Sequence, residues 1–113
     1  MLYDPQKWVM PEVPVRESEV VELLKEGRRR IIEEGWWQCT GPDRKAGYCT
    51  LLAITHQGTH NDFLCGKFDR ALSYLKRSTG AAFLPDWNDA PERTLVEVIA
   101  GYDRAIELAR ADA

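Results

Sequence analysis

The segment from Pro85 to Glu97 constrains the fold most, because a turn and the start of a helix meet in one short stretch. It reads Pro-Asp-Trp-Asn-Asp-Ala-Pro-Glu-Arg-Thr-Leu-Val-Glu. Thr94 and Glu97 have the spacing of a capping box, in which the threonine hydroxyl accepts the amide of Glu97 and the carboxylate accepts the amide of Thr94. A helix is therefore expected to begin at Thr94, with Trp87 in the bend that precedes it.

Three longer segments have apolar residues at helical spacing, which predicts a mainly α-helical domain. They cover residues 18–34, about 59–79 and 94–110, and the first two are followed by Gly35 and Gly80, which can end a helix. Residues able to cap their starts are Ser18, Thr59 or Asn61, and Thr94. The stripes expected to face the core are Val20, Leu23, Leu24, Gly27 and Ile31; Leu64, Phe68, Ala71, Leu72 and Leu75; and Leu95, Val98, Ile99, Tyr102, Ile106 and Ala109.

The region between the first two helices is ambiguous, since periodicity does not separate a short buried strand from a buried helix. Residues 41–47 are rich in turn-forming types. A hairpin that pairs 37–40 with 48–50, followed by a helix through Ile54, would satisfy both signals. The fold class is therefore predicted to be a compact bundle of about four helices, with a small β-hairpin as an open addition. Residues 1–14 contain three prolines and are predicted to form an extended arm on a single domain, residues 15–113.

Composition narrows the classes of partner. The net charge of −3 argues against general nucleic-acid binding, which needs a basic surface. Asp4, Pro5 and Gln6 occupy the place of the apolar part of a signal peptide, and no stretch has the length and apolarity to cross a bilayer. Three cysteines without a regular framework indicate reduced thiols. We expect a cytoplasmic protein with no membrane partner and no cofactor; homo-oligomerisation stays open.

Four features in order carry a resemblance to a known group. They are Gly35-Trp36-Trp37-Gln38, the run Tyr48-Cys49-Thr50-Leu51-Leu52-Ala53 after a glycine-containing turn, an amphipathic helix, and Trp87-Asn88-Asp89-Ala90-Pro91-Glu92-Arg93-Thr94. Together they resemble a small family of domains of unknown function in bacteria and their phages, over roughly residues 20 to 110. The resemblance implies the same layout and a bacterial or phage source, and it implies no activity.

Two alternative sites involve the sulfur and imidazole side chains. Zinc binds tetrahedral sets of Cys and His, and the candidates are Cys39, Cys49, His56, His60 and Cys65, although Gly58 interrupts the His pair and no Cys-x-x-Cys knuckle is present. The structural alternative is that the cysteines are small core residues and the histidines lie at the surface.

A thiol hydrolase is the second alternative. Cys49 follows a glycine-containing loop and would be the nucleophile, with His56 or His60 as its base and Asn88 or Asp89 orienting that base. This spacing carries little specificity, because many folded chains contain one residue of each type. A buried, unreactive Cys49 is the structural alternative.

The remaining candidates surround Trp87. Asp86 and Asp89 flank it and could act as paired acids, but short acids also close turns and cap helices. The binding hypothesis uses Trp37, Trp87, Asn88, Asp89 and Arg93, with Trp36 and Gln38 nearby in the proposed groove. Tryptophan and arginine are typical of the energetic centres of interfaces. The sequence thus predicts a non-enzymatic binding domain, accessory or inhibitor-like, that acts on a protein partner or on a small anionic ligand such as a nucleotide.

Overall fold

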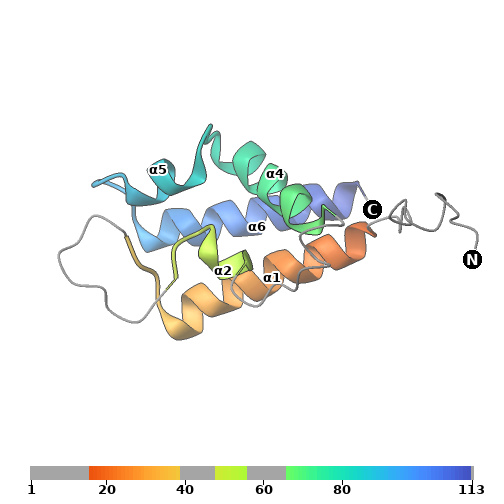
Figure 1. The fold of residues 1–113 in the computed structure, drawn as a ribbon, viewed down its shortest axis with the longest axis horizontal. Coiled ribbons are helices and arrows are strands. Elements are labelled where there is room, and N and C mark those ends of the chain that lie inside the picture. The colour runs from red at the N-terminus through yellow and green to blue at the C-terminus, as the bar shows by residue number, and fades with distance from the viewer. Residues whose placement is uncertain (1–15, 39–47, 56–65, 113) are drawn as a thin grey trace, which may run out of the picture.

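The structure is a computed structural model, and it describes residues 16–38, 48–55 and 66–112. These ranges contain five helices: α1 (Glu17–Glu34), α2 (Leu52–Thr55), α4 (Lys67–Thr79), α5 (Leu84–Asp89) and α6 (Leu95–Ala111) (Figure 1). The predicted mainly helical class is confirmed. None of the helices in these ranges is long and apolar enough to cross a membrane. The predicted arm, residues 1–14, lies outside the described residues.

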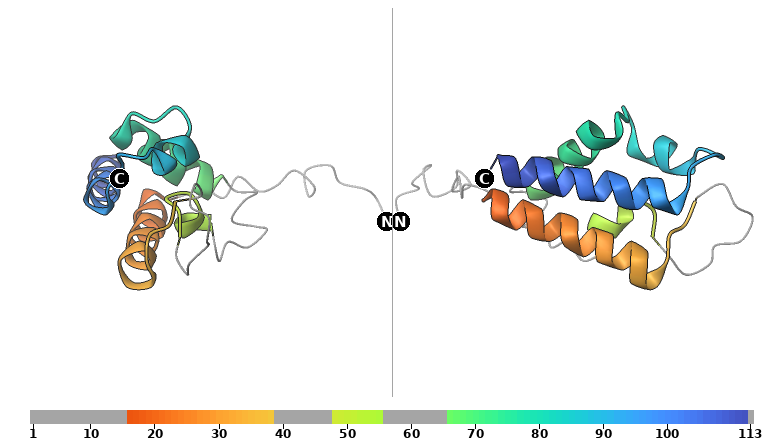
Figure 2. Two further views of the ribbon diagram at one scale, coloured as in Figure 1. Left: turned by 90° about the vertical axis from the view of Figure 1, so that its left-hand side faces the viewer. Right: turned by 180° about the vertical axis from the view of Figure 1, so that it is seen from behind.

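The two longest helices, α1 and α6, lie side by side in opposite directions (Figures 1 and 2). On its other side α6 packs against α4, and α2 contacts both α1 and α4. The side chains buried between these helices include Val20, Leu24, Ile31, Ile54, Phe68, Leu75, Leu84, Val98, Tyr102 and Ile106. The described residues of the three predicted stripes are buried or half-buried, except that Leu95 is 41% exposed. Leu64 of the second stripe lies outside the described residues. Leu95 stands at the first position of α6, and the buried residues of this helix begin at Val98.

Helices α1 and α6 approach each other closely at Gly27. A Cβ atom built there would lie 2.9 Å from both Cε1 and Oη of Tyr102, so only glycine leaves room for that ring. The Tyr102 hydroxyl continues past α1 and donates a 2.6 Å hydrogen bond to the carbonyl of Thr50. One residue of α6 thus fixes both α1 and the segment that leads into α2. Burial raises the pKa of Tyr102 well above its usual value, because the ionised phenolate would be desolvated.

Most helix ends follow the prediction. Thr94 and Glu97 form the expected capping box at the start of α6, with both reciprocal hydrogen bonds present. Gly35 and Gly80 stand at the C-terminal ends of α1 and α4. Ser18 was wrongly expected to cap α1: the helix already begins at Glu17, so Arg16 takes the N-cap position and makes no side-chain capping bond. Helix α4 begins at Lys67, after Gly66, and the expected caps Thr59 and Asn61 lie outside the described residues.

The predicted hairpin is tested only at its base. Trp36 and Tyr48 form an isolated β-bridge of parallel sense, closed by hydrogen bonds from the Trp37 amide to the Tyr48 carbonyl and from the Tyr48 amide to the Gly35 carbonyl. A hairpin needs antiparallel pairing, and this bridge does not provide it. The rest of that pairing includes Thr40, outside the described ranges, so it stays a prediction.

Arg30 is a charged residue in the interior of the fold. Its side chain is buried on α1, where it donates a 2.6 Å hydrogen bond to the carbonyl of Ala53 in α2. Glu26, one turn earlier, lies 3.7 Å from the same guanidinium. A buried charge is tolerated because it is hydrogen-bonded and paired. Arg30 therefore joins α1 to α2 and is not part of a basic surface.

Candidate functional site

The bend around Trp87 is a short helix, α5, which the sequence did not predict. Phe83 precedes it in an extended conformation, and Pro85 stands in its first turn, where a missing amide costs nothing. Leu84 is buried and anchors the start of the helix in the core. The six residues of α5 thereby bring Trp87 and Asn88 against the neighbouring segments.

Asn88 is completely buried and connects three parts of the chain. Its side-chain oxygen accepts hydrogen bonds from Trp36 Nε1 at 2.7 Å, from the Thr50 amide at 3.0 Å and from the Thr50 hydroxyl at 2.7 Å. Its side-chain nitrogen donates to the Trp37 carbonyl and to Asp89 Oδ1, both at 3.0 Å. Asn88 was predicted to contact a ligand; its amide is instead occupied in the interior, so its contribution is to hold the surrounding segments in place.

Gln38 strengthens the same junction. Its side-chain nitrogen donates to the carbonyls of Asn88, at 3.0 Å, and Ala90, at 2.9 Å. These carbonyls lie at the end of α5, where a helix has no internal donors for them. Residues 36–38 are therefore held against α5 by hydrogen bonds to both the side chain and the main-chain carbonyl of Asn88.

Arg93 covers the indole of Trp87. Its guanidinium carbon lies 4.0 Å from the ring centroid, within the range of a cation–π interaction. Arg93 Nε also donates to the Trp87 carbonyl at 2.9 Å, and its terminal nitrogen pairs with Glu97 at 2.7 Å. Hydrogen bonds from Thr94 and Arg93 hold the pKa of Glu97 below its usual range. Trp87 and Arg93 thus form one rigid unit that continues into the cap of α6.

A groove of about 240 Å³ lies beside this unit, between α4, α5 and α6. Its lining includes Trp87 of α5, Arg93, Thr79 of α4, and Glu97, Gly101 and Arg104 of α6. The backbone of α6 approaches α4 closely here, since a Cβ on Gly101 would lie 2.9 Å from the methyl carbon of Thr79. Two predicted site residues, Trp87 and Arg93, therefore line one cavity; Trp37 and Asp89 are half-buried and are absent from its lining.

The structure describes few of the residues proposed for the zinc site and for the thiol-hydrolase site. Cys49 is half-buried in the segment before α2, whereas Cys39, His56, His60 and Cys65 lie outside the described residues. Within the described ranges, no group of three or more His, Cys, Asp or Glu side chains could hold a metal ion. The zinc and thiol-hydrolase hypotheses therefore remain predictions.

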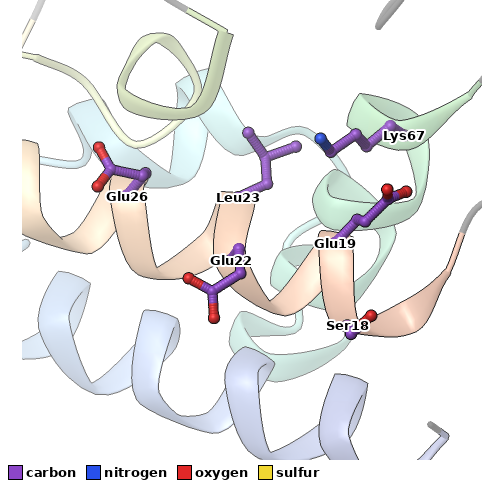
Figure 3. A pocket seen from close by; sticks show the side chains of 6 residues that line it. All are labelled: Ser18, Glu19, Glu22, Leu23, Glu26 and Lys67. Atoms are coloured by element: carbon purple, nitrogen blue, oxygen red, sulfur yellow. The ribbon is translucent and has the colours of Figure 1, made fainter.

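A larger groove, of about 380 Å³, lies on α1 and shares no lining residue with the candidate site. Figure 3 shows Glu19, Glu22, Leu23 and Glu26 along α1, with Lys67 of α4 reaching toward Leu23. Exposed carboxylates along a helix are ordinarily a solvated face. None of the other described residues that line this groove indicates a ligand.

Comparison with known proteins adds a family. No curated protein matches the chain, and no solved structure matches it. One family model matches residues 15–108, which is most of the chain; it includes α1, α2, α4 and α5 in full and α6 as far as Leu108. This chain therefore belongs to DUF6197, a family of unknown function.

Proposed function

We propose that this chain is a non-enzymatic binding domain that recognises a protein partner through the α5–α6 surface, defined by Phe83, Trp87, Arg93 and Val96. The observation that carries the proposal is the exposure of large apolar side chains. Among the described residues, three of the four that are exposed lie between positions 83 and 96: Phe83 at 57%, Leu95 at 41% and Val96 at 75%. Apolar side chains gathered on a surface are typical of interaction sites.

Phe83 and Val96 do not line the Trp87 groove, but each is close along the chain to residues that do. The carbonyl of Phe83 accepts the amide of Trp87, one turn along α5. Val96 directly precedes Glu97 and stands one helical turn before Ala100. Glu97 and Ala100 both line the groove. An aromatic residue and an arginine flanked by apolar side chains match the composition of interface centres.

A protein partner fits this surface better than a stacked nucleotide. Arg93 already covers the Trp87 ring at 4.0 Å, and Trp87 also packs against the hydrophobic core, so a flat ligand would have to displace Arg93. The groove of about 240 Å³ is also smaller than the ~300–1,000 Å³ pockets that enclose small ligands. It has the size for a side chain inserted from a larger partner.

The surface is also fixed before binding. Asn88 and Gln38 fasten α5 to residues 36–38 and to Thr50, and the capping box fixes the start of α6. A preorganised surface loses less conformational entropy on association. The accessory or inhibitor-like role is part of this proposal, and the bacterial or phage source rests on the sequence resemblance alone.

The test compares two exposed apolar residues. The wild-type chain is immobilised, the proteins it retains from a lysate of its native host are identified, and the affinity for the main one is measured by calorimetry. Val96→Gln should weaken that affinity about tenfold or more, because burying a valine contributes roughly 1.5–3 kcal/mol. Ile32→Gln is the matched control, since Ile32 is also exposed on a helix, at 47%, but lies on α1.

Circular dichroism should be the same for both variants, because neither side chain is buried. Equal affinities for Val96→Gln and wild type, with a further Phe83→Gln change also silent, would show that the partner uses another surface.

A further inference from the structure

We infer that the groove beside Trp87 receives a carboxylate group of the protein partner, and that Arg104 is the residue that pairs with it. This inference rests on the proposed function, because it names the chemistry of the partner at the same surface. Arg104 stands on α6 at the border of the groove, about two turns after Glu97.

Arg104 differs from Arg93 in the contacts that its guanidinium group already makes within the chain. Arg93 has a carboxylate partner in Glu97, a carbonyl partner in Trp87 and an aromatic face beneath it. Arg104 is exposed, and one of its terminal nitrogens donates a long hydrogen bond of 3.4 Å to the carbonyl of Ser78. No carboxylate of the described part of the chain forms an ion pair with Arg104.

The other polar groups of the lining are used inside the fold. The Ser78 hydroxyl donates to backbone carbonyls of α4 and α6. The Thr79 hydroxyl donates to the Leu75 carbonyl at 2.7 Å and accepts the amide of Ala81. Glu97 accepts from Arg93 and from Thr94. Arg104 is consequently the charged donor that the groove offers to a ligand.

Charge and size favour a carboxylate. The lining holds two guanidinium groups, Arg93 and Arg104, against one carboxylate, Glu97, which leaves one positive charge in excess. A carboxylate carries one negative charge, whereas a phosphate group carries about two. Arginine also matches the planar carboxylate with two parallel hydrogen bonds. The volume, about 240 Å³, is several times the ~30 Å³ of one water and admits an aspartate or glutamate side chain, or a chain terminus.

The first experiment uses acetate as the carboxylate and needs no partner. Nitrogen-15 NMR spectra of the full chain are recorded during a titration with sodium acetate, and again with sodium chloride at the same ionic strength. Acetate should produce saturable shifts of the Arg104 Nε–H and Gly101 amide signals. Arg104→Gln should abolish the Gly101 shift, and Arg110→Gln should retain it, because Arg110 is an exposed arginine of the same helix outside the groove.

Three results would overturn the inference: shifts in acetate that equal those in chloride, a Gly101 shift that persists in Arg104→Gln, or saturable shifts with sodium phosphate and none with acetate.

The second experiment separates this inference from the proposed function. With the captured partner at 150 mM salt, Arg104→Gln should reduce the affinity about tenfold, and Arg110→Gln should leave it unchanged. If Val96→Gln weakens binding and Arg104→Gln does not, the surface is right and the carboxylate contact is wrong. If neither changes the affinity, the proposed surface itself is wrong, whatever the acetate titration gives.

Discussion

Asn88 shows at the scale of one residue how the site is held. Its buried oxygen is the acceptor for Trp36 Nε1 and for two donors of Thr50. Asn88→Ala should lower the free energy of unfolding by about 2–4 kcal/mol, because each buried donor left without its acceptor costs roughly 1–3 kcal/mol. Chemical denaturation followed by circular dichroism measures this loss.

Asp86→Ala is the control for Asn88→Ala. Asp86 belongs to the same short helix but is exposed, so its removal should change stability by less than about 0.5 kcal/mol. Equal effects of the two substitutions would contradict the role of Asn88 as a buried connector.

The sequence could suggest that Asn88 matters but not what it does. An asparagine beside Trp87 in a polar bend reads equally well as a ligand contact or as a turn residue. Its true partners are Trp36, 52 positions away, and Thr50, 38 positions away. Residue spacing along the chain carries no information on such long-range pairs.

At the scale of elements, the capping box makes the start of α6 testable. Thr94→Ala should cost about 1 kcal/mol at neutral pH, because the hydroxyl that accepts the Glu97 amide is lost. Ser18→Ala should cost nothing measurable, since Ser18 is exposed and makes no cap on α1. Denaturant unfolding of both variants at pH 7 gives the comparison, and a similar loss in both would show that the cap of α6 does not stabilise it.

The same cap gives a pH dependence. Hydrogen bonds from Thr94 and Arg93 lower the pKa of Glu97 in the folded state, so the unfolded chain takes up this proton first as the pH falls. The contribution of Glu97 is therefore complete above its ordinary pKa of 4.5 and is lost as the pH falls through the lowered value. The stability difference between wild type and Thr94→Ala should shrink between pH 5 and pH 3, and a difference independent of pH would contradict this coupling.

Local signals predicted some elements and missed others. The C-terminal ends of α1 and α4 and the start of α6 could be predicted. Gly35, Gly80 and the capping box at Thr94 act through residues that are neighbours in the sequence. Helix α5 could not be predicted, since its six residues include a proline and three polar residues and lack a periodic apolar pattern. It depends on burial of Leu84 and on the contacts of Asn88 with distant segments.

At the scale of the whole molecule, the sequence pattern did not predict that the first long helix, α1, packs against the last, α6. Helices that follow each other in sequence often pack as neighbours, whereas α1 packs most extensively on α6. The pairing depends on Gly27, where the Tyr102 ring crosses the surface of α1. A glycine within an amphipathic helix predicts that some group approaches closely, but it does not identify that group.

Gly27→Ala tests this pairing, because two effects of opposite sign compete. Intrinsic helix propensity favours alanine by about 1 kcal/mol. The added methyl group would lie 2.9 Å from Tyr102 and 3.0 Å from Ile54 Cγ1, and both of these side chains are almost completely buried, so neither can move aside into solvent. Overpacking of this kind costs roughly 1–3 kcal/mol, and the displaced Tyr102 hydroxyl would also lose its bond to the Thr50 carbonyl. We therefore expect net destabilisation of about 1–2 kcal/mol in denaturant unfolding, and a stabilised Gly27→Ala variant would show that α1 and α6 do not approach each other at this point.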